Sequence, residues 1–200
     1  MRRGYGEYCA IARALDVLGG RWTLLIIREL AGGPRRYSDL LAGIPGIVTS
    51  VLNARMRELR DSGLVEQRRL PPPAGSTVYS LSERGREALP VLEALARWGT
   101  PMLEAKPRKD ARRAYWIAIA LAAGAEPDAR RSGVVELRSG DDDVAQIVIE
   151  GGTARALQGP AEDPDLVVSG TPERLAALGR DGAGVKLEGR AELLKQLAER

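Results

Sequence analysis

The chain has 200 residues, of which 44% are hydrophobic and 28% charged, and its net charge at pH 7 is +3. This length and composition fit a globular protein of about two domains and exclude a largely disordered chain. The absence of histidine removes the commonest general base near neutral pH. A single cysteine excludes an intrachain disulfide and favours a reducing compartment.

The charges are distributed unevenly between the two halves of the chain. Residues 1–109 hold 18 basic and 11 acidic side chains, a net charge of +7, whereas residues 110–200 hold 12 and 16, a net charge of −4. A basic first half is typical of a protein that binds a polyanion. Solvated arginines without a partner explain the same numbers equally well, so the charge alone leaves both interpretations open.

The hydropathy pattern indicates neither export nor membrane insertion. The start of the chain has no long apolar stretch and no small-residue cleavage site, so we expect no secretory signal. The most apolar run, residues 115–123, is half the roughly 20 residues of a membrane span and predicts a buried helix. We therefore expect a cytoplasmic protein without a membrane partner.

Apolar residues at helical spacing predict two helices near the start of the chain. They cover residues 8–18 and 22–31, and the second is apolar nearly all round and therefore buried. After a Gly-Gly-Pro break, Ser38 is predicted to cap a short helix that runs through Leu41. The proline–glycine pair at 45–46 predicts a tight turn, because proline presets φ and glycine tolerates unusual φ.

The next stretch, "GIVTSVLNARMRELRDSGLV" at 46–65, predicts an amphipathic helix. Its apolar side, which we expect in the core, consists of Val48, Leu52, Met56 and Leu59. Its polar side consists of Ser50, Asn53 and Arg57. A polar side with so few acidic residues favours contact with a polyanion.

Two β-rich runs, residues 64–70 and 76–82, flank a proline-bearing tip and predict a β-hairpin. Ser82 is predicted to cap a helix whose apolar residues repeat at steps of three and four through Trp98. Two helices, a short helix, a polar-faced helix and a hairpin follow the order of a winged helix-turn-helix domain. In such a domain the polar-faced helix enters the major groove of DNA, about 12 Å wide, and the hairpin forms the wing.

Several ordered blocks resemble the HxlR family of bacterial transcriptional regulators. They are Cys9, "LDVLGGRWTLLIIRELAGGPRRYSDL" at 15–40, "IPGI" at 44–47, "LNARMRELRDSGLV" at 52–65 and "YSLSERGREALPVLEALARWG" at 79–99. The resemblance covers residues 8–99. It implies a winged-helix dimer, joined through the first and last helices of the domain, that binds a palindromic operator on double-stranded DNA. Ala10, Val48 and Ser50 depart from the family's proline, serine and basic residue, so we expect a different operator.

We expect the DNA contacts on the polar-faced helix and on the wing. The candidate residues are Thr49, Ser50, Asn53, Arg55, Arg57, Arg68 and Arg69. A bidentate contact of Asn53 with adenine is worth about 1–3 kcal/mol of discrimination; an ordinary solvated residue is the alternative. Arg57 contacts guanine or phosphate, or else pairs with Asp61, while Arg55 lies nearer the core side. The two wing arginines alternate along a strand, so one should face out and the other pack.

Other conspicuous residues have plainer interpretations. Some HxlR relatives use the N-terminal cysteine as a redox sensor, which for Cys9 implies an intersubunit or mixed disulfide; a buried, inert thiol is the alternative. Trp22 and Trp98 are expected in the core or a dimer interface. Three aspartates at 141–143 could bind a hard cation but are typical of a turn, so we predict no metal and no cofactor.

The second half predicts a layer of helices over an antiparallel sheet, an α+β fold. A charged, proline-bearing segment at 106–113 is the best linker, between domains expected at 1–106 and 110–200. A buried helix at 111–123, five strands and two further helices follow. Thr171 is predicted to cap the first of those two helices.

The stretch "PDLVVSGTPERLAAL…GVKLEGRAELLKQL" within residues 164–197 resembles the sterol-carrier-protein-2-like domains. The resemblance implies a sheet-and-helix fold with an apolar tunnel, and hence a sensor domain for an apolar small-molecule effector. The candidate lining residues are Trp116, Leu121, Leu166 and Val168. A packed core that only aids dimerisation is the alternative.

Together these features predict a sequence-specific DNA-binding regulator, a homodimer with a winged helix-turn-helix domain and a small α+β sensing domain. The alternative is a lipid or small-molecule carrier whose winged helix serves only as an interaction module. An enzyme is not expected, because the sequence has no histidine, no Gly-x-Ser-x-Gly elbow and no Gly-x-x-x-x-Gly-Lys loop.

Overall fold

The computed structural model describes residues 4–73, 75–103, 110–178 and 184–198. The chain forms two compact units, Met1–Leu92 and Glu93–Arg200, and each is described by itself. The first four residues of the predicted linker, 106–109, lie outside the described residues. The predicted domain limits at 1, 106 and 200 fall outside them as well.

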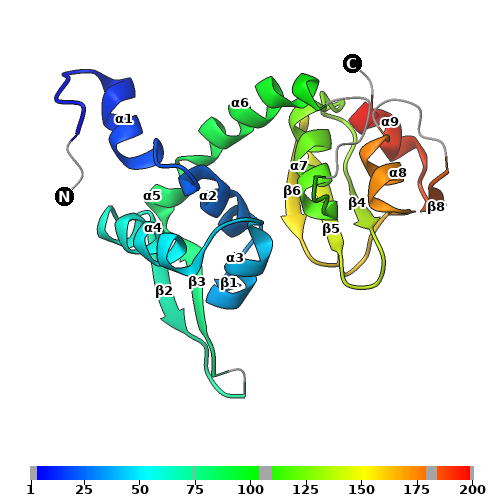
Figure 1. Cartoon of the computed structure of the whole chain (residues 1–200). Helices are drawn as coiled ribbons and strands as arrows, with labels where there is room; N and C mark the ends of the chain where they lie inside the picture. The colour runs from blue at the N-terminus through cyan, green and yellow to red at the C-terminus, as the bar shows by residue number, and fades with distance from the viewer. Residues whose placement is uncertain (1–3, 74, 104–109, 179–183, 199–200) are drawn as a thin grey trace. The chain divides into compact units, whose positions relative to one another are not determined.

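The first unit is a helical bundle with a small sheet (Figure 1). Its elements are α1 (Ala10–Leu18), α2 (Thr23–Ala31), β1 (Arg35–Arg36), α3 (Tyr37–Gly43), α4 (Thr49–Asp61), β2 (Val65–Arg69), β3 (Thr77–Leu81) and α5 (Glu83–Arg86). The helix α6 (Leu89–Gly99) runs across the boundary between the units and leads into a 3₁₀ turn, η1 (Thr100–Met102). The sheet has the order β1-β3-β2, and all its pairs are antiparallel. This order confirms the predicted winged helix-turn-helix.

The core of the first unit joins α2, α3, α4 and the base of the hairpin. Its buried residues are Ile26, Ile27, Leu30, Leu40, Ile44, Ile47, Leu52, Met56, Leu59, Leu64, Val65 and Leu81. The turn that leads into α4 has the predicted form: the Ile47 amide donates to the Ile44 carbonyl at 3.2 Å, and Gly46 has φ +84°. Only a residue without a Cβ adopts this φ at little cost, so the proline–glycine pair sets where α4 begins.

Two predicted helix starts need correction. Ser38 does not cap α3; the helix begins at Tyr37, because the Asp39 carboxylate accepts a hydrogen bond from the Arg36 amide at 3.1 Å. Ser82 does act as a cap, and its hydroxyl accepts from the Gly85 amide at 3.0 Å. The single helix predicted after it is instead two, α5 and α6, because Pro90 has no amide to continue the helical hydrogen bonds.

The second unit is a five-stranded sheet with helices (Figure 1). Its elements are α7 (Ala114–Gly124), β4 (Gly133–Arg138), β5 (Val144–Glu150), β6 (Thr153–Gln158), β7 (Leu166–Ser169), α8 (Pro172–Ala176), β8 (Lys186–Gly189) and α9 (Glu192–Ala198). The strand order is β6-β5-β4-β7-β8. The prediction of a purely antiparallel sheet was wrong, since β4 and β7 are parallel. After β6 the chain crosses over to pair β7 with β4, on the side of β4 opposite to β5. The residue pattern of a single strand does not predict such a crossover.

The core of the second unit lies between the sheet and helices α7, α8 and α9. It includes Val135, Leu137, Ile147, Ile149, Leu166, Leu175 and Leu193, all at most 1% exposed. Thr171 caps α8 as predicted, its hydroxyl accepting from the Arg174 amide at 3.4 Å. The helix α7 begins at Ala114 rather than at the predicted Ala111. The Ala114 amide donates a hydrogen bond to the Asp143 carboxylate at 2.9 Å. In the described part of the chain, no helix combines the length and hydrophobicity needed to span a membrane.

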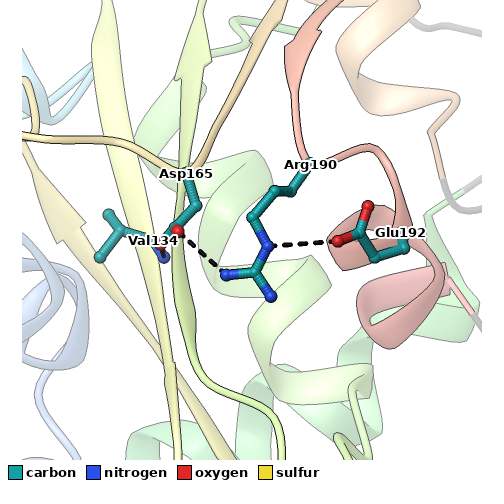
Figure 2. A network of polar contacts seen from close by, with 4 residues as sticks. All are labelled: Val134, Asp165, Arg190 and Glu192. Carbon is teal, nitrogen blue, oxygen red and sulfur yellow. Dashed lines mark hydrogen bonds and ion pairs between the residues drawn. The ribbon is translucent and has the colours of Figure 1, made fainter.

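A polar network joins the residue after β8, the last strand of this unit, to the segment before β7 and to β4 (Figure 2). The Asp165 carboxylate accepts from the Val134 amide at 2.9 Å and from the Arg190 guanidinium at 3.0 Å. The same guanidinium donates to Glu192 at 3.2 Å (Figure 2). The Val134 hydrogen bond, and after it the hydrogen bond from Arg190, lower the pKa of the Asp165 carboxyl from its ordinary value of 3.8.

This lowered pKa makes a prediction about acid stability. The folded protein favours the ionised carboxylate. Its contribution to the free energy of unfolding is therefore complete above the ordinary pKa and is lost as the pH falls through the lowered pKa. The Asp165→Asn variant should therefore melt at a lower temperature than the wild type at neutral pH, and the difference should shrink as the pH falls below about 4. Thermal melts at several pH values measure this. Asp163→Asn, which changes an exposed neighbour, is the control, and an undiminished difference at low pH would contradict the assignment.

Candidate nucleic-acid interface

The helix α4 has one buried and one exposed side. Leu52, Met56 and Leu59 are at most 4% exposed and confirm the predicted core side. The exposed residues are Thr49, Ser50, Asn53, Ala54, Arg57, Glu58, Arg60 and Asp61. Arg60 was not among the predicted contacts, although its seven-residue separation from Asn53 places it on the same side of the helix. Val48 is 58% exposed, so its assignment to the core was wrong: it precedes the helix in extended conformation, where a helical wheel does not apply.

The two central arginines of α4 have different surroundings. Arg55 pairs with Glu58 one turn later, and its side chain is only 20% exposed, as expected for a position near the core side. Arg57 is exposed, and no ion pair joins it to Asp61 or to any other described residue. Its guanidinium is therefore available for a partner outside the chain. This is the arrangement that contact with a base or a phosphate requires.

The N-terminal end of α4 is held by Tyr37, a residue that was not among the predicted candidates. The Tyr37 hydroxyl donates to the Thr49 carbonyl at 3.1 Å. Burial, and secondarily the neighbouring Tyr79, raises the pKa of this hydroxyl, so it stays protonated and able to donate. Because Tyr37 begins α3 and Tyr79 belongs to β3, these two interactions connect α4 with the wing. No sequence motif marks such a connection.

The wing consists of β2, β3 and the turn between them. The expectation that one of Arg68 and Arg69 packs was wrong: both are exposed, because beyond Val65 the hairpin leaves the body of the unit. They still alternate between the two faces of the sheet. The Arg69 Nε donates to the Gly75 carbonyl at 3.4 Å, a long contact that ties it to the wing turn.

A third strand, β1, adds two arginines to the wing sheet. Arg35 lies opposite Tyr79 and Arg36 opposite Val78. This strand could not be predicted from the sequence, because two residues are too few for any periodicity. The three-stranded sheet therefore carries four arginines, two on β1 and two on β2, and it lies next to α4 (Figure 1).

The remaining candidate residues of the first half lie elsewhere. Cys9 is half-buried at the residue before α1. Trp22 packs against the core of the first unit. Trp98 is 69% exposed on α6, which excludes a core position within this chain and leaves the predicted interface role untested.

The predicted lining residues of the second half belong to its packed interior. Leu166 and Val168 are fully buried in the core, and Trp116 and Leu121 pack against it while partly exposed. The aspartates at 141–143 lie in the connection between β4 and β5, as the turn interpretation expects. Among the described residues, no group of three or more His, Cys, Asp or Glu side chains is arranged to hold a metal ion.

The exposed polar helix α4, the turn before it and the three-stranded wing sheet together define a winged helix-turn-helix domain, a class that binds DNA. Residues 17–107 match the family model described as HxlR-like helix-turn-helix. The chain is 38% identical over 99 residues to an uncharacterized HTH-type transcriptional regulator of Synechocystis sp., covering 50% of this chain and 73% of that protein. The chain belongs to the HxlR-like helix-turn-helix family. Its relatives are transcriptional regulators, which are not enzymes.

Other relatives and structures match the same half of the chain. The HTH-type transcriptional regulator YodB of Bacillus subtilis is 33% identical over 91 residues, which cover 46% of this chain and 81% of YodB. The solved reduced form of YodB has a TM-score of 0.43 and 30% identity over 50% of this chain and 100% of that one. A MarR-family regulator from Porphyromonas gingivalis W83 has a TM-score of 0.46 and 30% identity, covering 51% and 100%.

Proposed function

We propose that the protein is a dimeric, sequence-specific transcriptional regulator that reads a palindromic operator with α4. The observation that carries this proposal is the exposed side of α4, where Asn53 and Arg57 lie beside small polar residues. Asn53 is suited to a bidentate contact with adenine, and Arg57 to guanine or phosphate. Thr49 and Ser50, at the start of the helix, are close enough in sequence to share the same groove. Cytoplasmic location follows from this role.

Dimerisation is supported by exposed apolar side chains on two helices. On α1, Ile11 is 71% and Leu15 43% exposed; on α6, Leu95 is 43% and Trp98 69% exposed. Exposing such side chains to water is unfavourable, and apolar stripes of this kind mark interaction sites. The family resemblance assigns the dimer contact to these same two helices. A dimer with two recognition helices about 34 Å apart fits an operator of two-fold symmetry.

The test is DNA binding by the full chain, followed by fluorescence anisotropy. The probe is duplex DNA from immediately upstream of the protein's own gene, with scrambled duplex as competitor and with the salt concentration varied. We expect selective binding that weakens as salt rises, because phosphate contacts release counterions. Equal affinity for the upstream and the scrambled duplex would refute sequence reading and favour the carrier alternative.

For the second unit we propose a sensing role, in which an apolar small molecule shifts the population competent to bind DNA. The support is the sheet-and-helix arrangement together with the partly exposed apolar residues Trp116 and Leu121 beside the core. Native mass spectrometry of the purified full chain should show a bound apolar molecule, and added ligand should change operator affinity. A chain that carries no such molecule and gains no thermal stability from a lipid and fatty-acid screen would leave a scaffold role.

A further inference from the structure

In the wing sheet, formed by β1, β2 and β3, one valine is flanked by an arginine on each side. Val78 on β3 lies opposite Arg36 of β1 on one side and opposite Arg68 of β2 on the other. Directly paired residues of antiparallel strands point to the same face of the sheet. Arg36, Val78 and Arg68 therefore form one row across the three strands.

This row lies on the face of the sheet that points away from the core. Tyr79 and Leu81 pack on the core of the first unit, and Val78, which directly precedes Tyr79 on the same strand, alternates to the other face. Val78 is nevertheless only 4% exposed. The register places the aliphatic stems of the two arginines beside it, and such stems cover apolar groups while the charged ends stay in water.

The charges around this row leave both guanidinium groups accessible. Arg36 and Arg68 are exposed, and neither forms an ion pair with another described residue. Two carboxylates are close in the fold. Asp39 accepts from the Arg36 amide and from the Ser38 hydroxyl, and Glu66 lies on the same face as Arg68, nearer the base of the hairpin.

The other two arginines of the sheet differ from this pair. Arg35 and Arg69 alternate to the opposite face, and Arg69 contacts the wing turn. Only Arg36 and Arg68 lie in one row, two strand spacings apart, which is about 10 Å between their Cα atoms. Guanidinium groups bind phosphate bidentately. We propose that Arg36 and Arg68 together bind backbone phosphates of the DNA; this assignment rests on the proposed function.

Salt-dependent DNA binding by Arg36→Gln and Arg68→Gln tests the pair in the full-length protein. The probes are the upstream duplex and a random-sequence duplex. Each substitution should weaken binding to both by about tenfold, leaving the ratio of the two affinities unchanged. The slope of log affinity against log salt should fall by about 0.9 for each phosphate that the variant no longer neutralises, or about 1.8 in a dimer. Arg35→Gln, the same change one residue earlier on the opposite face, is the matched control.

The outcomes separate this inference from the proposed function. If the wild type binds selectively but Arg36→Gln keeps the wild-type slope, or changes it no more than Arg35→Gln does, the phosphate pair is refuted and the regulator stands. A change in the affinity ratio would mean that Arg36 reads bases, which also refutes the assignment. If the wild type binds neither duplex, the proposed function fails and the pair fails with it.

Discussion

An Ile11→Asp variant should be a monomer in solution and should lose most of its affinity for the operator. Ile11 is 71% exposed on α1, so the substitution removes little from the fold of the single chain. In a dimer contact, by contrast, it would bury an unpaired charge, which is strongly unfavourable. Light scattering after gel filtration should give the mass of one 21.5 kDa chain, whereas the wild type should give twice that mass.

The weaker operator binding follows from the absence of the second DNA-binding unit. Linking two binding sites raises the overall affinity by about 100-fold to 10,000-fold, so a monomer should bind about 100-fold more weakly or worse. Arg13→Gln is the control, because Arg13 lies on the opposite side of α1 and its 64% exposed side chain forms an ion pair with Asp16 at 3.6 Å, a kind of contact that contributes little to stability. A variant that keeps the mass of a dimer, or a wild type that is itself a monomer, would contradict the assignment of α1.

The elements of the fold could be predicted where the cause is local. Helical spacing, the proline–glycine turn at 45–46 and the caps at Ser82 and Thr171 all depend on residues close in sequence, and all are confirmed. The same holds for the core side of α4, where Leu52 and Leu59 are buried.

The misses have causes that lie far away in the sequence. The strand β1 exists only because β3, some 40 residues later, pairs with it. The parallel contact of β7 with β4 depends on a crossover. The exposure of the candidate residues was predicted better on α4 than on the wing, where the strand register decides which arginines share a face.

In the proposed regulator, α4 and the wing would contact DNA in different ways. Side chains on α4 face outward from a helix fixed by its buried side and by the Tyr37 contact at its start. The wing arginines Arg36 and Arg68 are suited to bind backbone phosphates, which do not depend on the base sequence. Backbone contacts position a protein on DNA, whereas contacts with base edges select the sequence. Substitutions on α4 should therefore change selectivity, whereas substitution of Arg36 or Arg68 should change the affinity for all DNA.

Asn53→Ala and Arg57→Ala should each reduce the preference for the operator over random duplex by about 30-fold or more. One bidentate base contact is worth about 1–3 kcal/mol of discrimination. Each substitution occurs twice in a dimer, so the loss is at least about 2 kcal/mol, which is about 30-fold. Both residues are exposed and alanine favours helix, so the melting temperature should not fall.

The measurement is the ratio of the two dissociation constants at one salt concentration. Arg84→Ala, which removes one exposed charge from α5, is the control and should preserve the ratio. If Asn53→Ala weakens binding to both duplexes equally, Asn53 touches the backbone and not a base. If neither variant changes the ratio while the wild type remains selective, the sequence is read by DNA shape or by other exposed residues of the same helix, such as Thr49, Ser50 and Arg60.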